Sequence, residues 1–390
     1  MRISDDERRA RLAERHRLLP RTRTDDLTVM ADDLVALHST DPVTVYLSAM
    51  TRMVHPSIPA VEQALYVDRS LIRHHAMRRT LWLATPEVVR QLHAAATRKL
   101  VLPEHKRVIK LLSEGGVVDP EAWLEDARGQ ILAYLDEHGP TTARELGRRV
   151  PALRQPLVMA RGTRWQATVS AHTRMLTLLG FEGRVLRGPP TGTWVSGAYA
   201  YATADDWLPG GLGELDEQTA AALLVRRWLR GFGPATTADV VWWFGWTKSL
   251  AVAALTAAEA VPVELTDGPG WLAVDDRPAS EPEPWVAVLP ALDPTTMGWK
   301  QRGWYLPDVA AEAFDSAGNG GPTLWVDGRI VGAWAQTRDG EIHTHYFERV
   351  AATRRREIDL RITEIKKLVG ATRFTVRFPG DVHDRLLSGR

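Results

Sequence analysis

The sequence predicts a mainly α-helical protein with some β-structure, built from three tandem winged helix-turn-helix modules followed by a β-barrel-like C-terminal domain. Three observations favour this fold class: a helix–Gly-Pro–helix repeat, short strand-like segments after each copy, and a change to β-rich sequence from Trp285. Duplicated patterns of this kind indicate duplicated modules. The expected domains span residues 1–125, 126–210, 211–280 and 285–390.

The first expected module contains a short polar island, His38-Ser39-Thr40-Asp41, between two apolar helical segments. Asp41 suits the N-cap position of a helix, and Pro42 suits its first turn. We therefore expect a helix–helix turn whose polar side chains point into a cleft. Taken alone, the same residues also fit a capped turn with a structural histidine. The segments expected here are helices at 3–20, 27–37, 42–53 and 60–75 and a strand at 78–84.

The repeat defines the second and third modules. Ile131–Val150 and Leu223–Phe244 share an apolar helix, a Gly-Pro pair and a threonine that can cap a second helix. In the second module we expect a recognition helix over Thr163–Leu179 and a wing at Gly188–Gly192. In the third module the corresponding helix is expected at Ser249–Ala260, followed by a second wing.

The C-terminal part begins after a linker at residues 275–284 and contains short strand-like segments. Asp327-Gly328 and Asp339-Gly340 are typical of hairpin turns between such strands. A charged helix is expected over 352–368, and a last strand over 373–378.

The amino-acid composition excludes several classes of protein and of site. The chain has no cysteine, which excludes disulfides and thiolate catalysis. No apolar run approaches the roughly 20 residues that span a membrane. The charged N-terminus lacks the apolar core of a signal peptide. We therefore expect a cytoplasmic protein with no membrane partner, and a monomer.

Charge is unevenly distributed along the chain. Residues 52–110 contain eleven Lys/Arg against four Asp/Glu, and residues 144–187 contain nine against two. Such blocks can line a cationic groove for phosphates, although solvated helix faces produce the same counts.

Winged helices in tandem favour double-stranded DNA as the partner, because recognition helices enter grooves and wings hold phosphates. Winged helices also serve in protein–protein contacts. The residues expected to contact DNA are Arg52, Arg78, Arg79, Arg161, Arg164, His172 and Arg174.

No metal or cofactor site is expected. His74-His75 are adjacent, and His343 and His345 lack carboxylates at ligand spacing, so we interpret both pairs as structural or surface residues. The chain has no Gly-rich phosphate loop and no nucleophile elbow.

Several motifs resemble those of the AlkZ-like DNA glycosylases, bacterial enzymes of tandem winged helices with a C-terminal β-barrel. The motifs are the island with Pro42, Arg79–Trp82, residues 233–246, Leu289–Asp293 and residues 326–334. The resemblance implies DNA repair by excision of N7-alkylated purines, and some family members unhook interstrand crosslinks made by antibiotics or nitrogen mustards.

The island departs from the family's catalytic motif, which is Gln-x-Gln or Gln-x-Asp. His38 and Thr40 occupy the two positions. An N7-alkylated purine is a cationic leaving group, so its hydrolysis mainly needs a held water and stabilisation of an oxocarbenium-like sugar. A histidine can position that water and accept its proton near neutral pH. We therefore expect His38 and Thr40 to be catalytic, with Asp41 either a third member or only the N-cap.

The leading hypothesis is a monofunctional DNA glycosylase that acts, without a cofactor, on bulky or N7-alkylated purines in damaged duplex DNA, including antibiotic–DNA adducts or crosslinks. One alternative is a non-enzymatic winged-helix DNA-binding protein such as a regulator. Another is a self-resistance protein that sequesters a drug or its DNA adduct. An enzyme needs an open island, whereas a regulator can bury it.

Overall fold

The computed structural model describes residues 1–388, apart from 160, 161, 163, 165 and 280–282. The chain folds as a mixed α/β protein with 48% helix and 17% strand, so the expected predominance of helix is confirmed. The count of three tandem winged helices stays a prediction. Among the described residues, no helix has the length and apolar character needed to cross a lipid bilayer.

The helices are α1 (Asp5–Arg15), α2 (Leu27–Asp33), α3 (Pro42–Arg52), α4 (Ile58–Glu62), α5 (Pro86–Leu92), α6 (Val101–Glu114), α7 (Pro120–His138), α8 (Ala143–Arg149), α9 (Ala171–Phe181), α10 (Ala204–Trp207), α11 (Glu217–Phe232), α12 (Thr237–Phe244), α13 (Lys248–Ala257), α14 (Ala352–Val369) and α15 (His383–Ser388). The strands are β1 (Leu37–His38), β2 (Ile72–His75), β3 (Leu81–Ala84), β4 (Thr141–Thr142), β5 (Pro156–Met159), β6 (Ala167–Ser170), β7 (Val185–Pro190), β8 (Tyr199–Thr203), β9 (Val261–Leu265), β10 (Gly268–Leu272), β11 (Val286–Leu289), β12 (Thr323–Val326), β13 (Arg329–Gln336) and β14 (Ile342–Tyr346).

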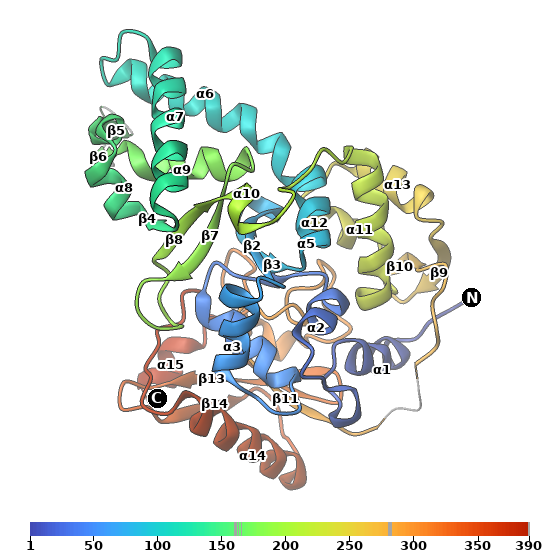
Figure 1. Ribbon diagram of the computed structural model, residues 1–390. Coiled ribbons are helices and arrows are strands. Elements are labelled where there is room, and N and C mark those ends of the chain that lie inside the picture. Colours follow the sequence, from blue (N-terminus) through green and yellow to red (C-terminus); the bar gives the residue numbers. More distant parts are fainter. Residues whose placement is uncertain (160–161, 163, 165, 280–282, 389–390) are drawn as a thin grey trace.

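A six-stranded antiparallel sheet lies at the centre of the molecule, in the order β1-β3-β2-β7-β8-β4 (Figure 1). It combines strands from the first and second expected modules, and β2 meets β7 through the pair Arg73–Arg187. The expected helix over 27–37 is wrong in its second half, because α2 ends at Asp33 and Leu37–His38 pairs with β3. The polar island therefore follows an edge strand of this sheet.

A lobe of α6, α7, α8 and α9 projects from the central sheet, with the β5–β6 hairpin at its side (Figure 1). The expected recognition helix over Thr163–Leu179 is wrong at its start. Residues 167–170 form β6 and pair with β5, and the helix begins only at Ala171 after the N-cap Ser170. The β-branched residues Thr168 and Val169 suit an extended strand better than a helix.

The C-terminal domain contains an open four-stranded sheet, β11-β12-β13-β14. The predicted β-barrel-like arrangement is wrong for the described residues: β11 and β14 are the edges of the sheet and do not pair. Helix α14 packs on this sheet and buries Ile358, Ile362 and Ile365 against its apolar side chains. Because a helix covers that face, the sheet buries its apolar surface without closing on itself.

The predicted strand over 373–378 is also wrong. Residues 373–376 have no regular secondary structure, and the segment instead runs across the polar island. Its two phenylalanines pack at 6.3 Å between ring centroids, Phe374 against Trp194 and Phe378 against His38. The alternating apolar residues that suggested a strand thus serve side-chain packing.

Candidate active site and nucleic-acid contacts

The polar island connects β1 to α3. His38 ends β1 and pairs in register with Trp82 of β3. Asp41 is the N-cap of α3 and Pro42 is its first residue, which confirms the start of this helix. His38, Ser39 and Asp41 are buried, whereas Thr40 is half-buried. A short loop between two rigid elements therefore fixes the island, with Thr40 as its most accessible residue.

The His38 imidazole is neutral in this environment. Its side chain is only 5% exposed, and its ring lies edge-on to Trp82 at 4.9 Å between centroids. Burial, and secondarily the positive charge of Arg78, lowers the pKa of His38 to about 3. The backbone N–H of Thr40 donates to Nδ1 at 3.4 Å, which places the proton of the neutral ring on Nε2. Among the described residues, no hydrogen bond engages that Nε2–H group.

Thr40 is held at three of its polar atoms. Its backbone N–H donates to His38, and its carbonyl accepts from the Arg377 guanidinium at 3.1 Å. Its Oγ1 accepts from the backbone N–H of Leu81 at 3.3 Å. A hydroxyl that accepts one hydrogen bond still has its own proton to donate and a second lone pair. Thr40 therefore presents a fixed hydroxyl with remaining hydrogen-bonding capacity.

Asp41 acts structurally in this turn. Its Oδ1 accepts from the backbone N–H of Val43 at 3.2 Å, as an N-cap does, and its Oδ2 accepts from the backbone N–H of Arg377 at 3.1 Å. Burial raises the pKa of this carboxyl, while the two backbone N–H groups oppose that rise. Both oxygens are engaged, so the geometry favours the N-cap role.

A buried arginine that the sequence analysis did not single out lies behind the island. Arg73 is 1% exposed, and its Nε donates to the Ser39 hydroxyl at 2.6 Å. Its Nη1 donates to the Tyr66 hydroxyl at 3.2 Å, and its guanidinium lies 4.3 Å from the ring centroid of Tyr199. The ring face supplies a cation–π contact in place of a carboxylate. The neighbouring residues Leu71 and Ile72 are apolar, but the local sequence does not identify the partners of Arg73.

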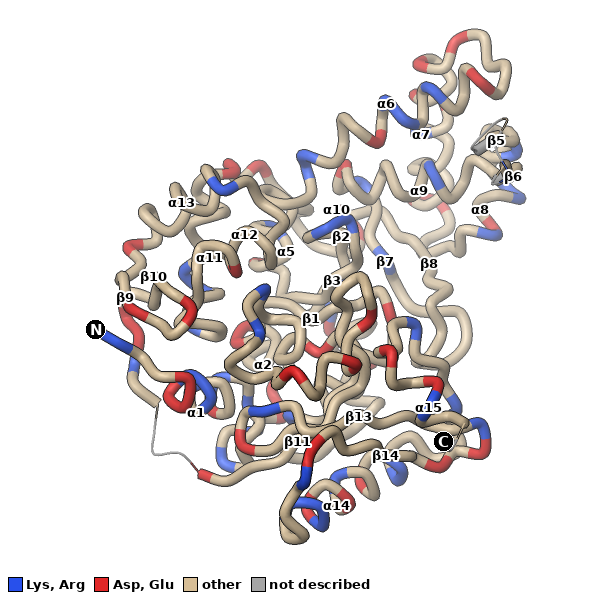
Figure 2. The backbone as a smooth tube through the Cα atoms, turned by 180° about the vertical axis from the view of Figure 1, so that it is seen from behind, with Lys and Arg blue, Asp and Glu red and all other residues tan. Residues whose placement is uncertain are grey.

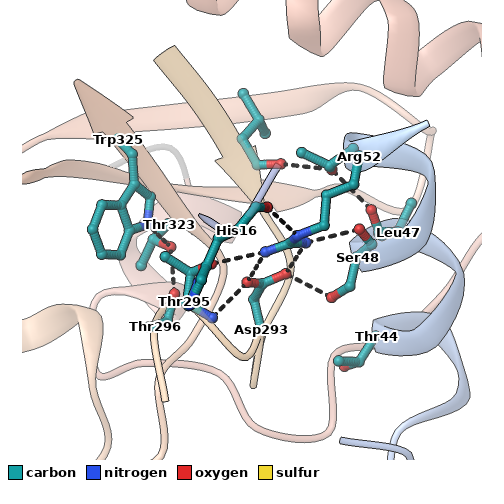
Figure 3. A network of polar contacts seen from close by, with 12 residues as sticks. His16, Thr44, Leu47, Ser48, Arg52, Asp293, Thr295, Thr296, Thr323 and Trp325 are labelled. Carbon is teal, nitrogen blue, oxygen red and sulfur yellow. Dashed lines mark hydrogen bonds and ion pairs between the residues drawn. The ribbon is translucent and has the colours of Figure 1, made fainter. Parts of the chain in front are cut away.

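Arg52 does not contact DNA as predicted. Its side chain is fully buried and forms an ion pair with Asp293, with Nη2 2.8 Å from Oδ1 and Nη1 2.9 Å from Oδ2 (Figure 3). Nη2 also donates to Thr295, and Nε donates to the carbonyl of His16. The predicted DNA contact is wrong because a partner distant in sequence draws this guanidinium into the interior.

Asp293, the last residue of the motif Leu289–Asp293, gives this motif a structural role in the fold. Burial alone would raise the pKa of Asp293, but the Arg52 guanidinium and the Ser48 hydroxyl, which donates at 2.6 Å, hold it below its usual value. Since Ser48 and Arg52 belong to α3, this carboxylate ties α3 to the C-terminal domain (Figure 3).

Arg78 and Arg79 lie close to the island on the turn between β2 and β3. Both have positive φ, 54° and 63°, which is uncommon for residues other than glycine. Arg78 is exposed and stacks 4.4 Å from the ring centroid of Trp242. Although the residue as a whole is exposed, its guanidinium is largely shielded from water. This desolvation, and secondarily the nearby charge of Arg302, lowers the pKa of Arg78 to about 10, so it stays cationic. Arg79 forms an ion pair with the buried Glu104 at 2.5 Å.

Three of the remaining predicted DNA contacts, Arg164, His172 and Arg174, belong to the projecting lobe. Arg161 lies outside the described residues. Arg164 is exposed in the connection between β5 and β6. Because α9 begins at Ala171, Arg164 does not belong to the helix on which it was expected.

His172 and Arg174 do lie on α9. The Nδ1 of His172 is 2.6 Å from the Ser170 hydroxyl, and partial burial lowers its pKa. Arg174 lies 3.4 Å from Glu104, the carboxylate that also pairs with Arg79. Two arginines thus share one carboxylate. Lys and Arg positions recur along α6, α8 and β7 around it (Figure 2).

Metal-ligating side chains do not cluster in the described part of the chain, where no three His, Asp or Glu residues could hold an ion together. His74 and His93 approach each other at 3.1 Å between ring nitrogens, and both are buried with lowered pKa values. Burial is the larger cause for each ring, so the pair is a neutral element of the core.

Comparison with known proteins identifies the family. No curated protein matches the chain. The solved structure of the Streptomyces sahachiroi DNA glycosylase AlkZ is similar in fold, with a TM-score of 0.71 at 19% identity over 97% of this chain and 100% of that one. The family model for "DNA glycosylase AlkZ-like" matches residues 31–367, a segment that includes the island and the Arg52–Asp293 pair. The chain therefore belongs to the AlkZ-like DNA glycosylase family.

Proposed function

We propose that the chain is a monofunctional DNA glycosylase that hydrolyses the N-glycosidic bond of bulky or N7-alkylated purines in duplex DNA. The observation that carries the proposal is the unused hydrogen-bonding capacity of His38 Nε2 and Thr40 Oγ1 on a turn fixed at both ends. Both Asp41 oxygens of the turn are engaged, and the Ser39 hydroxyl accepts from Arg73 and is fully buried, so these two groups are left for a ligand or a water.

The chemistry follows from the charge state of His38. With a pKa of about 3, the ring is neutral at pH 7, and its conjugate acid is too acidic for it to take a proton effectively from water. The Nε2–H group donates a hydrogen bond instead. His38 and Thr40 would therefore orient the attacking water, as two glutamines would, rather than deprotonate it. This revises the general-base role that the sequence suggested.

A site that only orients the attacking water is sufficient for hydrolysis when the leaving group is an alkylated purine. The positively charged base leaves without prior protonation, so the barrier lies mainly in forming the oxocarbenium-like sugar. Fixed dipoles that hold the water at the anomeric carbon then supply the catalysis. The substrates would include antibiotic–DNA adducts or crosslinks.

DNA would be held by positive charge near the island and on the lobe. Arg78 is exposed and cationic beside Trp242, and Arg79, Arg164 and Arg174 add further charge. Binding by several phosphate contacts weakens by orders of magnitude between roughly 50 and 200 mM salt. Fluorescence anisotropy with an undamaged duplex measures this slope, and salt-independent binding would rule out the phosphate-contact role.

A second candidate function is supported by the burial of the island. His38 is 5% exposed, Asp41 is 3% exposed and Ser39 is fully buried. A non-enzymatic DNA-binding protein, either a regulator or a self-resistance protein that sequesters an adduct, can keep such a turn covered, whereas hydrolysis needs it accessible to the lesion.

One assay separates the two functions. The purified protein is incubated with duplexes that carry N7-alkylguanine adducts of increasing size, and abasic sites are detected by alkaline cleavage. The proposal expects abasic sites with wild-type protein and their loss in His38→Ala. Tight binding of the adduct duplex without abasic sites at any adduct size would instead support the sequestering protein.

A further inference from the structure

We infer that Arg377, on the segment 372–381 beyond the family-matched residues, is a positioning residue for the reacting turn. The inference deepens the proposed function and rests on it. The family model ends at residue 367, so it does not include this segment. In sequence, Arg377 is 336 residues from Asp41 and 337 from Thr40, yet it contacts both.

The contacts of Arg377 are made to the backbone and the cap of the island. Its Nη1 donates to the Thr40 carbonyl at 3.1 Å, and its own backbone N–H donates to Asp41 Oδ2 at 3.1 Å. Thr40 in turn donates its backbone N–H to His38 Nδ1. Arg377 therefore holds the carbonyl of Thr40, and the backbone N–H of Thr40 determines which nitrogen of the His38 ring carries the proton.

The segment is anchored on both sides of Arg377. Before it, the Gln336 side chain donates to the Thr372 carbonyl at 3.2 Å and accepts from the Phe374 backbone N–H at 3.2 Å. After it, the backbone N–H groups of Asp381 and Val382 donate to carbonyls of residues 314 and 312. Because the segment 372–381 is fixed on both sides of Arg377, holding Arg377 in place costs little additional conformational entropy.

On the side away from the island, the backbone leaves room for the Arg377 guanidinium. Gly197 lies against Arg377, and a Cβ at that position would collide with the Nη2 atom. Phe378, the next residue, places its ring edge-on to His38 at 6.3 Å between centroids. Arg377 thus lies between the β7–β8 connection and the island, and Phe378 of the same segment packs against the His38 ring.

The chemical consequence is a more uniform orientation of the water-holding groups. If the Thr40 carbonyl is released, the Thr40–Asp41 peptide rotates more freely about the Thr40 Cα, which it shares with the Ser39–Thr40 peptide. The N–H of that second peptide then holds its position less firmly, and the N–H···Nδ1 bond that keeps the proton on Nε2 is populated less. The donor offered to the attacking water is then present in a smaller fraction of molecules. A lost exposed hydrogen bond of this kind predicts a rate decrease of about tenfold.

The test uses the full-length protein and three variants. Arg377→Met removes the guanidinium but retains the backbone N–H to Asp41. Arg377→Lys restores a donor of similar reach. Arg373→Met is the matched control, because Arg373 lies on the same segment and, among the described residues, its side chain bonds only to the carbonyls of residues 339, 370 and 372. Each variant is examined by ¹⁵N NMR of its histidine rings and by single-turnover excision on an N7-alkylguanine duplex.

The inference expects Arg377→Met to shift the His38 ring-nitrogen signals and to slow excision about tenfold, with duplex affinity unchanged. Arg377→Lys should recover both readouts, and Arg373→Met should match wild type. Unchanged His38 signals in Arg377→Met would overturn the inference, even with slower excision, because Arg377 would then act through DNA. If the wild-type protein excises nothing, the proposed function fails, while the NMR readout still decides whether Arg377 positions the turn.

Discussion

The two ends of α3 hold polar clusters of opposite character. At the C-terminal end, all three guanidinium nitrogens of Arg52 and both carboxylate oxygens of Asp293 have partners. At the N-terminal end, the Asp41 carboxylate is engaged, but His38 Nε2 and the Thr40 hydroxyl retain unused capacity. The first arrangement suits a structural connection and the second suits a site that binds a ligand. We call the C-terminal cluster the paired end and the N-terminal cluster the unpaired end. Substitutions at the paired end should therefore lower stability, whereas those at the unpaired end should lower the excision rate.

The largest effect is expected at the paired end. Asp293→Ala leaves the Arg52 guanidinium buried without its counter-charge, and breaking a buried pair in this way costs about 3–5 kcal/mol. Urea unfolding measures the loss of stability. Glu364→Ala, which removes the exposed partner of Arg361 on α14, is the control and should cost under about 1 kcal/mol. Equal losses in the two variants would remove the contrast between the clusters.

At the unpaired end we expect substitutions to lower the rate of base excision. His38→Ala should slow base excision by about 10² to 10³-fold, the usual effect of removing one preorganised hydrogen-bond donor. Duplex affinity should change little by comparison. His55→Ala, at an exposed histidine that pairs with Asp25, is the control. Wild-type excision rates in His38→Ala would show that this histidine is structural.

Both clusters contain a histidine with a lowered pKa of about 3: His16 at the paired end and His38 at the unpaired end. Burial is the first cause in each case. Because the unfolded pKa is near 6.5, protonation favours the unfolded chain, so the stabilisation is complete above pH 6.5 and is lost as the pH falls toward 3.

From pH 7 to pH 5, each of these histidines should lower the free energy of unfolding by about 2 kcal/mol. Urea titrations at the two pH values measure the total loss, and His16→Gln should reduce it. A free energy of unfolding that is independent of pH in this interval would contradict the neutral, buried state of the rings.

The smallest expected effect belongs to Thr40. Thr40→Val removes the hydroxyl while keeping the shape of the side chain, and loss of one orienting hydrogen bond should slow excision about tenfold. Thr40→Ser keeps the hydroxyl and should retain the wild-type rate within about threefold. If both substitutions slow excision equally, packing of the Thr40 methyl group, and not its hydroxyl, determines the effect.

The sequence predicted the local features of the site well. The Asp41-Pro42 pair identified the start of α3, because capping chemistry acts between neighbouring residues. Family motifs identified the fold and the position of the island. The β5–β6 hairpin was missed because the expectation of a recognition helix outweighed the β-branched residues that precede Ala171.

The failures involve partners distant in sequence. Arg52 follows an apolar helix and resembles a surface cation until Asp293, 241 residues away, is brought against it. Arg377 was part of an expected strand, and its contacts to the island depend on how the last segment crosses the sheet. The charge state of His38 was likewise assigned from the ordinary histidine pKa, since burial cannot be derived from four residues of a turn.

The central claim is that His38 orders water as a neutral donor. It is tested by single-turnover excision of N7-alkylguanine from pH 5.5 to 8, corrected for spontaneous depurination, with wild-type protein and His38→Gln. A pKa of about 3 predicts a wild-type rate that is nearly constant across this interval, and His38→Gln should retain the rate within about tenfold. A wild-type rate that falls with a midpoint near 6.5, together with loss of that midpoint and of activity in His38→Gln, would contradict the account and restore the general-base role.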